Sequence, residues 1–373
     1  MLKRRIKRIT IKNYRSIADL TVELPDLTVL VGENGSGKSN FVDALRFLSD
    51  AIVNLSFAIE KSGGIANIKY QSHGHYDDYE YFLIEVVIHI NEDDYAYGIA
   101  ISTTSSTDMI QQEYCRKNDK TLFDYHNGVW KTAPYHLPVG RLSNNLVLPL
   151  LTNYVEFENI YTFLKDIHIY AIHPNHLLSD FQRMNDNKIL MENGENLASI
   201  LYHVQKNLSY IHDDIIEYLS KIVGIESIHV KEIEPDYLLI TLIHNNQNRF
   251  TLSQESDGTV RLLSLLTALY QPYRPSLTII EEPELFVHSG VLAMVYDAIE
   301  ESALHQQIII TTHSPDLITK FDAHAIRVVE LTDNGTKIDM IDDNLLEAVN
   351  QKFVSTGDIL SMEGRLRRKQ YDQ

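Results

Sequence analysis

The chain has 373 residues, of which 44% are hydrophobic and 23% charged, as is typical of a globular protein long enough to bury its own core. The formal net charge of -18 argues against wholesale wrapping of nucleic acid, because phosphate contacts depend on lysine and arginine. The single cysteine excludes an internal disulfide, and no stretch approaches the roughly 20 apolar residues of a membrane helix, so we expect a cytoplasmic protein without membrane contact.

The first predicted elements lead into a glycine-rich loop. Residues 6–12 and 20–24 alternate like half-buried strands, and residues 27–31 form a continuous apolar run that is typical of a buried parallel strand. Residues 32–39 read GENGSGKS, and apolar residues at helical spacing follow over 41–55. Strand, loop and helix together are the setting in which this P-loop motif binds phosphate.

The chemistry of the P-loop predicts individual roles. Glycines let the backbone form a nest of N–H groups that point at phosphate, at the positive end of the following helix. Lys38 would place its charge on the β- and γ-phosphates of ATP, and Ser39 would offer its hydroxyl to Mg²⁺. The predicted nucleotide-binding residues of this segment are Gly32, Asn34, Gly35, Ser36, Gly37, Lys38, Ser39 and Asn40.

The character of the chain changes between residues 61 and 195, where we expect an inserted, strand-rich lobe. Its predicted elements are strands at 81–90, 95–102 and 109–116 and a helix near 154–166. Trp130 is expected to be a packing residue. A group of histidines and aspartates is interpreted as a solvated loop in preference to a metal site; its members are His73, His75, Asp77 and Asp78.

Helices and strands alternate along the rest of the chain, which indicates an α/β domain with a mostly parallel sheet. Two helical segments are expected within 196–222, with Asn196 as the N-cap and Gly224 as the stop. The remaining predictions are helices at 258–271 and 287–303, strands at 226–233, 237–244, 250–252, 277–281, 307–311, 325–331 and 337–341, and a polar helical tail at 343–369.

Two of these strands run into polar side chains. Glu281 and Glu282 end the first, and they suit Mg²⁺ coordination and the activation of water beside a phosphate. His313 follows the second and can donate a hydrogen bond to a γ-phosphate. Because α/β sheets bind ligands at strand ends, we assign Glu281 to the Mg²⁺ shell and Glu282 to polarising the attacking water. Alone, the carboxylates could instead be a helix start.

A further anion site is expected where Ser256 and Gly258 open a helix. Free N–H groups at a helix start bind anions, and this site has no lysine of its own. It suits a nucleotide held by a second molecule, although by itself it would be an ordinary helix cap.

These elements, in this order, resemble the ABC-type ATPase head of RecF, SMC and OLD-like proteins. The resemblance is carried by residues 11–17 (IKNYRSI), 30–40 (LVGENGSGKSN), 256–259 (SDGT), 280–284 (IEEPE) and 311–315 (TTHSP). It implies an α/β P-loop NTPase with an antiparallel lobe. It also implies a head-to-head dimer, in which each ATP lies between the P-loop of one chain and the Ser256 and Gly258 of the other.

Single residues also gain roles from the resemblance. Glu282 would be the catalytic carboxylate and His313 the switch histidine, with Lys38 as the third catalytic residue, while Asn13 or Arg15 would lie near the nucleotide. The implied domain plan is 1–60 as the N-terminal part of the ATPase domain, 61–195 as the inserted lobe, 196–342 as the C-terminal part, and 343–373 as the tail.

The sequence departs from the family pattern in places. Ser-Asp-Gly-Thr stands at 256–259 where transporters have Ser-Gly-Gly-Gln, and Glu281 replaces the usual Walker B aspartate. The Q-loop glutamine, which would join Ser39 and Glu281 at the metal, is either Gln71 or Gln182. Gln71 is favoured because it precedes the strands of the inserted lobe.

Two functions are consistent with these expectations. The first is an ATPase subunit whose ATP-dependent homodimer controls a separately encoded effector, a nuclease or toxin, in bacterial phage defence. The segment after residue 318 is too short for a Toprim nuclease domain, and no sustained heptad for coiled-coil arms appears between 50 and 250. The alternative is a RecF-like repair ATPase that binds DNA through basic clusters at 3–8 and 365–369. The strand-rich insertion and altered signature disfavour a transporter subunit.

Overall fold

The computed structural model describes residues 4–71, 80–104, 109–134, 145–177, 179–314 and 320–341. The group of His73, His75, Asp77 and Asp78 and the tail at 343–369 lie outside these residues. The described chain forms two compact units: the first contains the residues up to 167 and those from 324 onward, and the second contains residues 168–323. The domain limits expected after residues 60 and 195 remain predictions.

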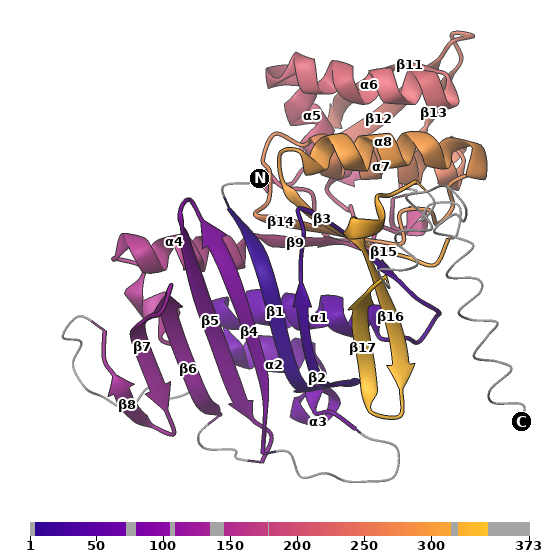
Figure 1. Ribbon diagram of the computed structural model, residues 1–373. Coiled ribbons are helices and arrows are strands. Elements are labelled where there is room, and N and C mark those ends of the chain that lie inside the picture. The colour runs from indigo at the N-terminus through magenta and orange to yellow at the C-terminus, as the bar shows by residue number, and fades with distance from the viewer. Residues whose placement is uncertain are drawn as a thin grey trace, which may run out of the picture. The chain divides into compact units, whose positions relative to one another are not determined.

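A seven-stranded antiparallel sheet lies in the first unit (Figure 1). Its order is β2-β1-β4-β5-β6-β7-β8, and the register of β1 on β4 runs from Arg4 opposite Ile90 to Lys12 opposite Leu83. The antiparallel lobe is thus confirmed, but its strands continue the N-terminal sheet because β1 offers β4 a full edge. The strands are β1 (Arg4–Tyr14), β2 (Ile17–Glu23), β4 (Tyr81–Ile90), β5 (Asp93–Ser102), β6 (Ile110–Lys117), β7 (Lys120–His126) and β8 (Val129–Thr132).

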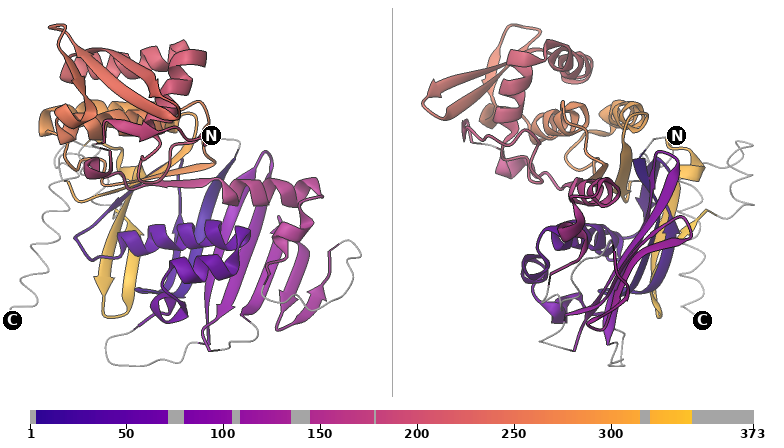
Figure 2. Two further views of the ribbon diagram at one scale, coloured as in Figure 1. Left: turned by 180° about the vertical axis from the view of Figure 1, so that it is seen from behind. Right: turned by 90° about the vertical axis from the view of Figure 1, so that its left-hand side faces the viewer.

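Helices α1 and α2 lie across one face of this sheet (Figure 2). Helix α1 buries Phe41, Leu45 and Leu48, as their helical spacing predicts. Phe47 of the same helix packs edge to face against Phe82 of β4, with ring centroids 5.3 Å apart. The helices of the unit are α1 (Lys38–Val53), α2 (Leu55–Lys61), α3 (Ile65–Ile68) and α4 (Val155–Lys165), with a 3-10 turn at η1 (Leu148–Leu151).

Three further strands of the first unit flank the glycine-rich loop. Strand β3 (Leu27–Val31) pairs in parallel with β16 (Ile326–Thr332), with Val29 opposite Ile326. Strands β16 and β17 (Gly335–Met340) form an antiparallel hairpin. Four of the five residues of β3 are buried, which confirms the parallel strand predicted from the continuous apolar run.

The second unit contains one parallel pair of strands and one antiparallel sheet. Strand β14 pairs in parallel with β15, with Ile279 opposite Ile309, and β9 lies next to β14 in the strand order. The antiparallel sheet has the order β10-β12-β11, and β13 also pairs with β12. The elements are β9 (Ile167–Tyr170), η2 (Pro174–His176), β10 (Phe181–Arg183), α5 (Leu197–Asn207), α6 (Ser209–Val223), β11 (Ile225–Glu234), β12 (Tyr237–His244), β13 (Arg249–Thr251), η3 (Leu252–Gln254), α7 (Asp257–Tyr270), β14 (Leu277–Glu281), η4 (Ser289–Val291), α8 (Leu292–Ala303), β15 (Gln307–Thr312) and, at the boundary of the units, η5 (Ala323–Ala325).

Local predictions in this unit have mixed outcomes. Gly224 ends α6 in the left-handed conformation, at φ 71°, which confirms the predicted stop. Asn196 is the N-cap residue of α5, as predicted, but its Oδ1 accepts from the Met191 N–H at 2.8 Å and makes no capping bond to the helix within the described residues. The helix expected from residue 287 begins at Leu292, because a run of turns follows β14. No helix in the described ranges combines the length and apolar character that a membrane crossing requires.

Candidate functional site

The P-loop joins the end of β3 to the start of α1, and its glycines are required by its conformation and by its neighbours. Gly35 and Gly37 have φ of 82° and 107°, in the left-handed region that favours glycine. A β-carbon on Gly32 would lie 2.2 Å from the Val329 carbonyl oxygen of β16, and one on Gly37 would lie 2.1 Å from Thr336 Oγ1. The β16–β17 hairpin therefore allows only glycine at these two positions.

Lys38 and Ser36 line the interior of this loop. Lys38 is only 6% exposed, and its Nζ donates to the carbonyl oxygens of Gly32 and Glu33 at 2.7 and 2.9 Å. The buried Ser36 hydroxyl has no hydrogen-bond partner within the described part of the chain. Asn34 and Ser39 are exposed beside them. A buried cation, a spare hydroxyl and a glycine turn at a helix start together fit a phosphate chain.

Side chains outside the motif hold the loop in place. Ser16, between β1 and β2, has its Oγ 2.7 Å from Thr336 Oγ1 and accepts from Asn40 Nδ2 at 2.6 Å. The Thr336 hydroxyl also donates a hydrogen bond to the Ser36 carbonyl oxygen at 3.2 Å. Asn40, predicted to bind nucleotide, is thus bonded within this cluster. Sequence reasoning missed Ser16 and Thr336, although Ser16 lies inside the opening IKNYRSI motif.

Arg15 is paired with the first helix. Its Nε lies 2.6 Å from Asp43 Oδ2 in α1, and its backbone has φ 50°. The Tyr14 hydroxyl donates to the same Asp43 oxygen at 2.6 Å, and burial together with the Asp43 charge raises the pKa of Tyr14 above its ordinary value. Asp43 therefore orients the Arg15 side chain, and the contact of Arg15 with nucleotide remains a prediction.

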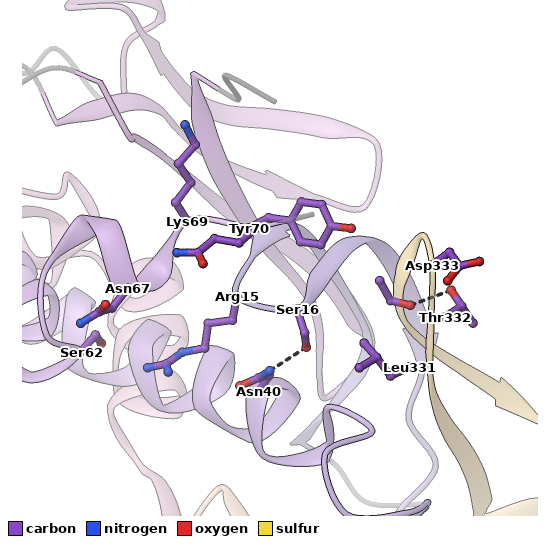
Figure 3. A pocket seen from close by; sticks show the side chains of 12 residues that line it. Arg15, Ser16, Asn40, Ser62, Asn67, Lys69, Tyr70, Leu331, Thr332 and Asp333 are labelled. Carbon is purple, nitrogen blue, oxygen red and sulfur yellow. Dashed lines mark hydrogen bonds between the residues drawn. The ribbon is translucent and has the colours of Figure 1, made fainter. Parts of the chain in front are cut away.

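A pocket of about 500 Å³ opens beside the start of α1 (Figure 3). Its lining comes from the β1–β2 turn, from the segment after α2 and from the β16–β17 hairpin, and its residues include Arg15, Asn40, Lys69, Tyr70, Thr332 and Asp333. Its volume is that of a typical small-molecule site. Because Asn40 directly follows Ser39, the pocket adjoins the P-loop.

The two Q-loop candidates differ in their surroundings. Gln71 is exposed and lines this pocket, and its Nε2 donates a long 3.4 Å bond to the Ala66 carbonyl oxygen. Gln182 is buried in the second unit, where its Oε1 accepts from the Ala198 N–H at 3.0 Å at the start of α5. Gln71 is therefore accessible to a ligand, whereas the Gln182 side chain is used in a hydrogen bond at the start of α5. The metal role of Gln71 remains a prediction.

The carboxylates of the second unit follow an unusual turn. Glu281 ends β14, and Glu282 has φ 46°, a conformation that is strained for a residue with a β-carbon. The Glu282 N–H donates to the Thr311 carbonyl oxygen of β15 at 3.0 Å, which fixes the turn to the neighbouring strand. Both carboxylates are half-buried, and as oxygen ligands they suit a hydrated Mg²⁺.

His313 lies against the second of these carboxylates, Glu282. Its Nδ1 is 3.4 Å from Glu282 Oε1, so the structure brings together two residues that were predicted separately. The same Nδ1 is 3.6 Å from Oε1 of Glu284, a residue to which the sequence reasoning gave no role. The imidazole is 42% exposed, which leaves part of the ring open to a ligand.

The signature segment is fixed to the same turn. Ser256 is the N-cap of α7, with its Oγ accepting from the Thr259 N–H at 3.2 Å, and it is exposed. A β-carbon on Gly258 would lie 2.7 Å from the Phe286 carbonyl oxygen, so glycine is required there too. Arg261 of the same helix is buried, and sequence reasoning missed it.

Arg261 joins α7 to the carboxylate turn through backbone carbonyl groups. One terminal nitrogen donates to the carbonyl oxygens of Glu281 and Glu282 at 2.9 and 3.2 Å, and the other donates to that of Ile172. Burial lowers the pKa of the guanidinium to about 10, against the opposing charges of Glu284 and Glu282. The predicted site residues thus form two sets, a phosphate cradle in the first unit and a carboxylate, histidine and signature group in the second.

Comparison with known proteins points to one group. A family model described as "AAA domain, putative AbiEii toxin, Type IV TA system" matches residues 27–319. The Old nuclease of Escherichia phage P2 is 24% identical over 367 residues, covering 89% of this chain and 60% of the relative. Endonuclease GajA of Bacillus cereus strain VD045 is 23% identical, covering 85% of this chain and 57% of the relative. The chain therefore spans about three fifths of the length of these curated relatives.

A shorter match and the solved structures agree with this. The DNA replication and repair protein RecF of Brucella abortus strain 2308 is 49% identical over 45 residues, or 12% of each chain. A solved SmcHead bound to the C-winged helix domain of ScpA has a TM-score of 0.62 at 16% identity, covering 91% of this chain and 99% of that one. These matches confirm the predicted fold and the resemblance to RecF, SMC and OLD-like ATPases.

Proposed function

The chain belongs to the AAA domain family whose model it matches, and from this premise we propose that it binds ATP with Mg²⁺ and hydrolyses ATP to ADP and phosphate. The observation that carries this proposal is the conformation of the P-loop. Lys38 is buried against the loop carbonyl groups, and the buried Ser36 hydroxyl has no hydrogen-bond partner among the described residues. Lys38 would exchange its carbonyl contacts for the β- and γ-phosphates, as the P-loop lysine does by its position in the motif. The adjoining pocket, with Tyr70 in its wall, would receive the nucleoside.

In the proposed reaction a water oxygen bonds to the γ-phosphorus and the bond from that phosphorus to the β,γ-bridging oxygen breaks. The Glu282 carboxylate orients this water and accepts its proton, and His313 donates a hydrogen bond to the γ-phosphate. Bound Mg²⁺, with Ser39, Glu281 and Gln71 as candidate contacts, would neutralise the charge that gathers on the leaving ADP. The 3.4 Å separation of Glu282 and His313 supports their action as a pair.

We further propose that two copies enclose two ATP molecules. Ser256 is exposed at the start of α7 and Gly258 is held close to the chain that follows β14, so their N–H groups form an anion site without a lysine. Because this site has no lysine of its own, we propose that the phosphate it binds belongs to a nucleotide held by the P-loop of a second copy.

The output of the dimer is proposed to be control of a separate effector, a nuclease or toxin, in bacterial defence against phage. The similarity to Old nuclease and endonuclease GajA supports this. The short RecF match supports the alternative, a repair ATPase acting on DNA. Fluorescence anisotropy of labelled duplex DNA, with and without ATP across a salt series, separates the two; salt-sensitive, ATP-dependent binding would favour the alternative.

The central test uses two variants. Lys38→Ala should abolish binding of a fluorescent ATP analogue, because it removes the buried positive charge of the P-loop. Glu282→Gln should bind ATP normally and hydrolyse it roughly 100-fold more slowly, since an amide cannot accept the proton of water. Normal phosphate release by Glu282→Gln would overturn its assigned role.

A further inference from the structure

Glu284 binds the end of β15 and His313, the residue that follows it. Its side chain is only 8% exposed, and its Oε1 accepts from the Thr312 hydroxyl at 2.6 Å and from the His313 backbone N–H at 3.2 Å. A single buried carboxylate oxygen thus fixes the last residue of β15 and the residue after it. Either bond would be met equally well by a neutral amide oxygen.

The placement of the imidazole distinguishes Glu284 from such a structural acceptor. His313 Nδ1 lies 3.4 Å from Glu282 Oε1 and 3.6 Å from Glu284 Oε1, so two carboxylates face one ring nitrogen. An Nδ1–H group placed there can be donated to one or the other with a small rotation of the ring. A proton on Nδ1 attracts a carboxylate oxygen more strongly than an amide oxygen, since charge-assisted hydrogen bonds are stronger than neutral ones.

The second oxygen of the Glu284 carboxylate, Oε2, has different surroundings from Oε1. Oε2 is buried and has no hydrogen-bond partner among the described residues, so one face of this carboxylate is left unused. The buried Arg261 guanidinium lies close enough for its charge to interact with Glu284. The Glu284 carboxylate thus uses Oε1 for the Thr312 hydroxyl and the His313 N–H, and the same atom faces the imidazole.

We propose that Glu284 is a positioning residue for His313, which competes with Glu282 for the Nδ1–H of the imidazole. When the Nδ1–H group is donated to Glu284, the Glu282 carboxylate is free to hold the attacking water, and donation to the γ-phosphate then requires a second proton, on Nε2. When His313 donates to Glu282, the water site is blocked. The inference rests on the proposed function, in which Glu282 acts on water.

The test is Glu284→Gln, which keeps the acceptor for Thr312 and for the His313 N–H but removes the charge. Glu232→Gln, at an exposed position of β11, is the matched control. Glu284→Gln should lower kcat roughly 10- to 100-fold, the effect typical of losing a carboxylate partner of a functional histidine, with the Kd for ATP within about twofold of wild type. Wild-type kcat in Glu284→Gln would show a purely structural acceptor and overturn the proposal.

A second readout needs no hydrolysis. Nitrogen-15 spectra of the histidine rings, with His313 identified by the signals lost in His313→Asn, report which ring nitrogen carries the proton. The ATP-free wild type should show His313 protonated at Nδ1, and the Nδ1 resonance should shift in Glu284→Gln as its hydrogen bond passes from Glu284 to Glu282. If Glu284→Gln does not fold, the wild-type spectrum still decides, because an unprotonated Nδ1 contradicts the proposal. Normal hydrolysis by Glu282→Gln, in contrast, would overturn the role of Glu282 on water, on which this inference rests.

Discussion

Glu113 on β6 shows what a single buried side chain can do for this fold. It is fully buried, and its carboxylate accepts from the Val147 and Leu148 N–H groups and from the Tyr97 hydroxyl, so it ties the start of η1 to the sheet. Burial raises the pKa of Glu113 to about 7, although these three bonds oppose the shift. The fold therefore prefers the protonated acid more than the unfolded chain does.

This preference predicts a pH dependence. Because the folded protein binds the proton more tightly, stability should be complete below the unfolded pKa, near pH 4.5, and should fall as the pH rises through about 7. Glu113→Gln should flatten this part of the profile, which amounts to roughly 3 kcal/mol for a shift of this size. Urea unfolding at pH 5, 6, 7 and 8 measures it, with the exposed Glu158→Gln as control. Parallel profiles for wild type and Glu113→Gln would contradict the prediction.

A matched pair of glycines tests the P-loop residue by residue. Gly32→Ala would push a β-carbon against a backbone carbonyl that cannot rotate away, whereas Gly35 has no described atom within 4 Å of its added β-carbon and suffers only from its φ. We expect Gly32→Ala to lose about 2 kcal/mol or more and to weaken ATP binding, and Gly35→Ala to lose roughly 1 kcal/mol. Urea unfolding and analogue titration check both. Equal losses would show that close packing against β16 is not the cause.

Motif chemistry explains which site residues sequence could reveal. Lys38, Glu282 and His313 belong to short patterns whose spacing encodes their task, so they were predictable. Thr336 and Glu113 are equally specific in their contacts, yet each meets its partners only after distant segments come together. One sequence carries no signal for such pairs, because a buried threonine or glutamate looks like a surface residue until the fold is known.

At the scale of elements, the periodicity of buried side chains predicted most of the strands and helices that the structure describes, although α2, α3, β7, β8, β9 and β10 were not expected. What it did not predict was the partner of each strand. The strands at 81–90 and beyond were expected as a lobe, but β4 extends the N-terminal sheet along β1. Alternation in β4 defines which side chains face inward and leaves open which edge the backbone joins.

The attachment of α7 to the carboxylate turn can be tested as a contact between elements. Arg261→Lys keeps the charge but cannot reach three separate carbonyl groups with one ammonium, so buried acceptors lose their donors. We expect a loss of roughly 2 kcal/mol in urea unfolding and faster hydrogen exchange in both α7 and the segment after β14. Arg249→Lys on β13, which is exposed, serves as control. Faster exchange confined to α7 would mean that the helix is not anchored to the turn.

The whole molecule is expected to assemble with a second copy. In Glu282→Gln, ATP should double the native mass, since the nucleotide is bound and not consumed. Adding Ser256→Arg should return the mass to that of one chain while ATP binding persists, because the bulky side chain would fill the site that receives the nucleotide of the facing copy. Native mass spectrometry reads both states, and Ser253→Arg, at a nearby exposed position, is the control. A dimer that survives Ser256→Arg would contradict the sandwich arrangement.

The support of the P-loop by the β16–β17 hairpin has a consequence for synthesis on the ribosome. Ser36 and Thr336 are in contact but 300 residues apart in the chain. At a translation rate of about 5–20 residues per second, the loop emerges roughly 15–60 seconds before the hairpin that holds it. We therefore expect the nascent chain to bind nucleotide only after the hairpin is made, which would keep an incomplete copy out of the proposed dimer.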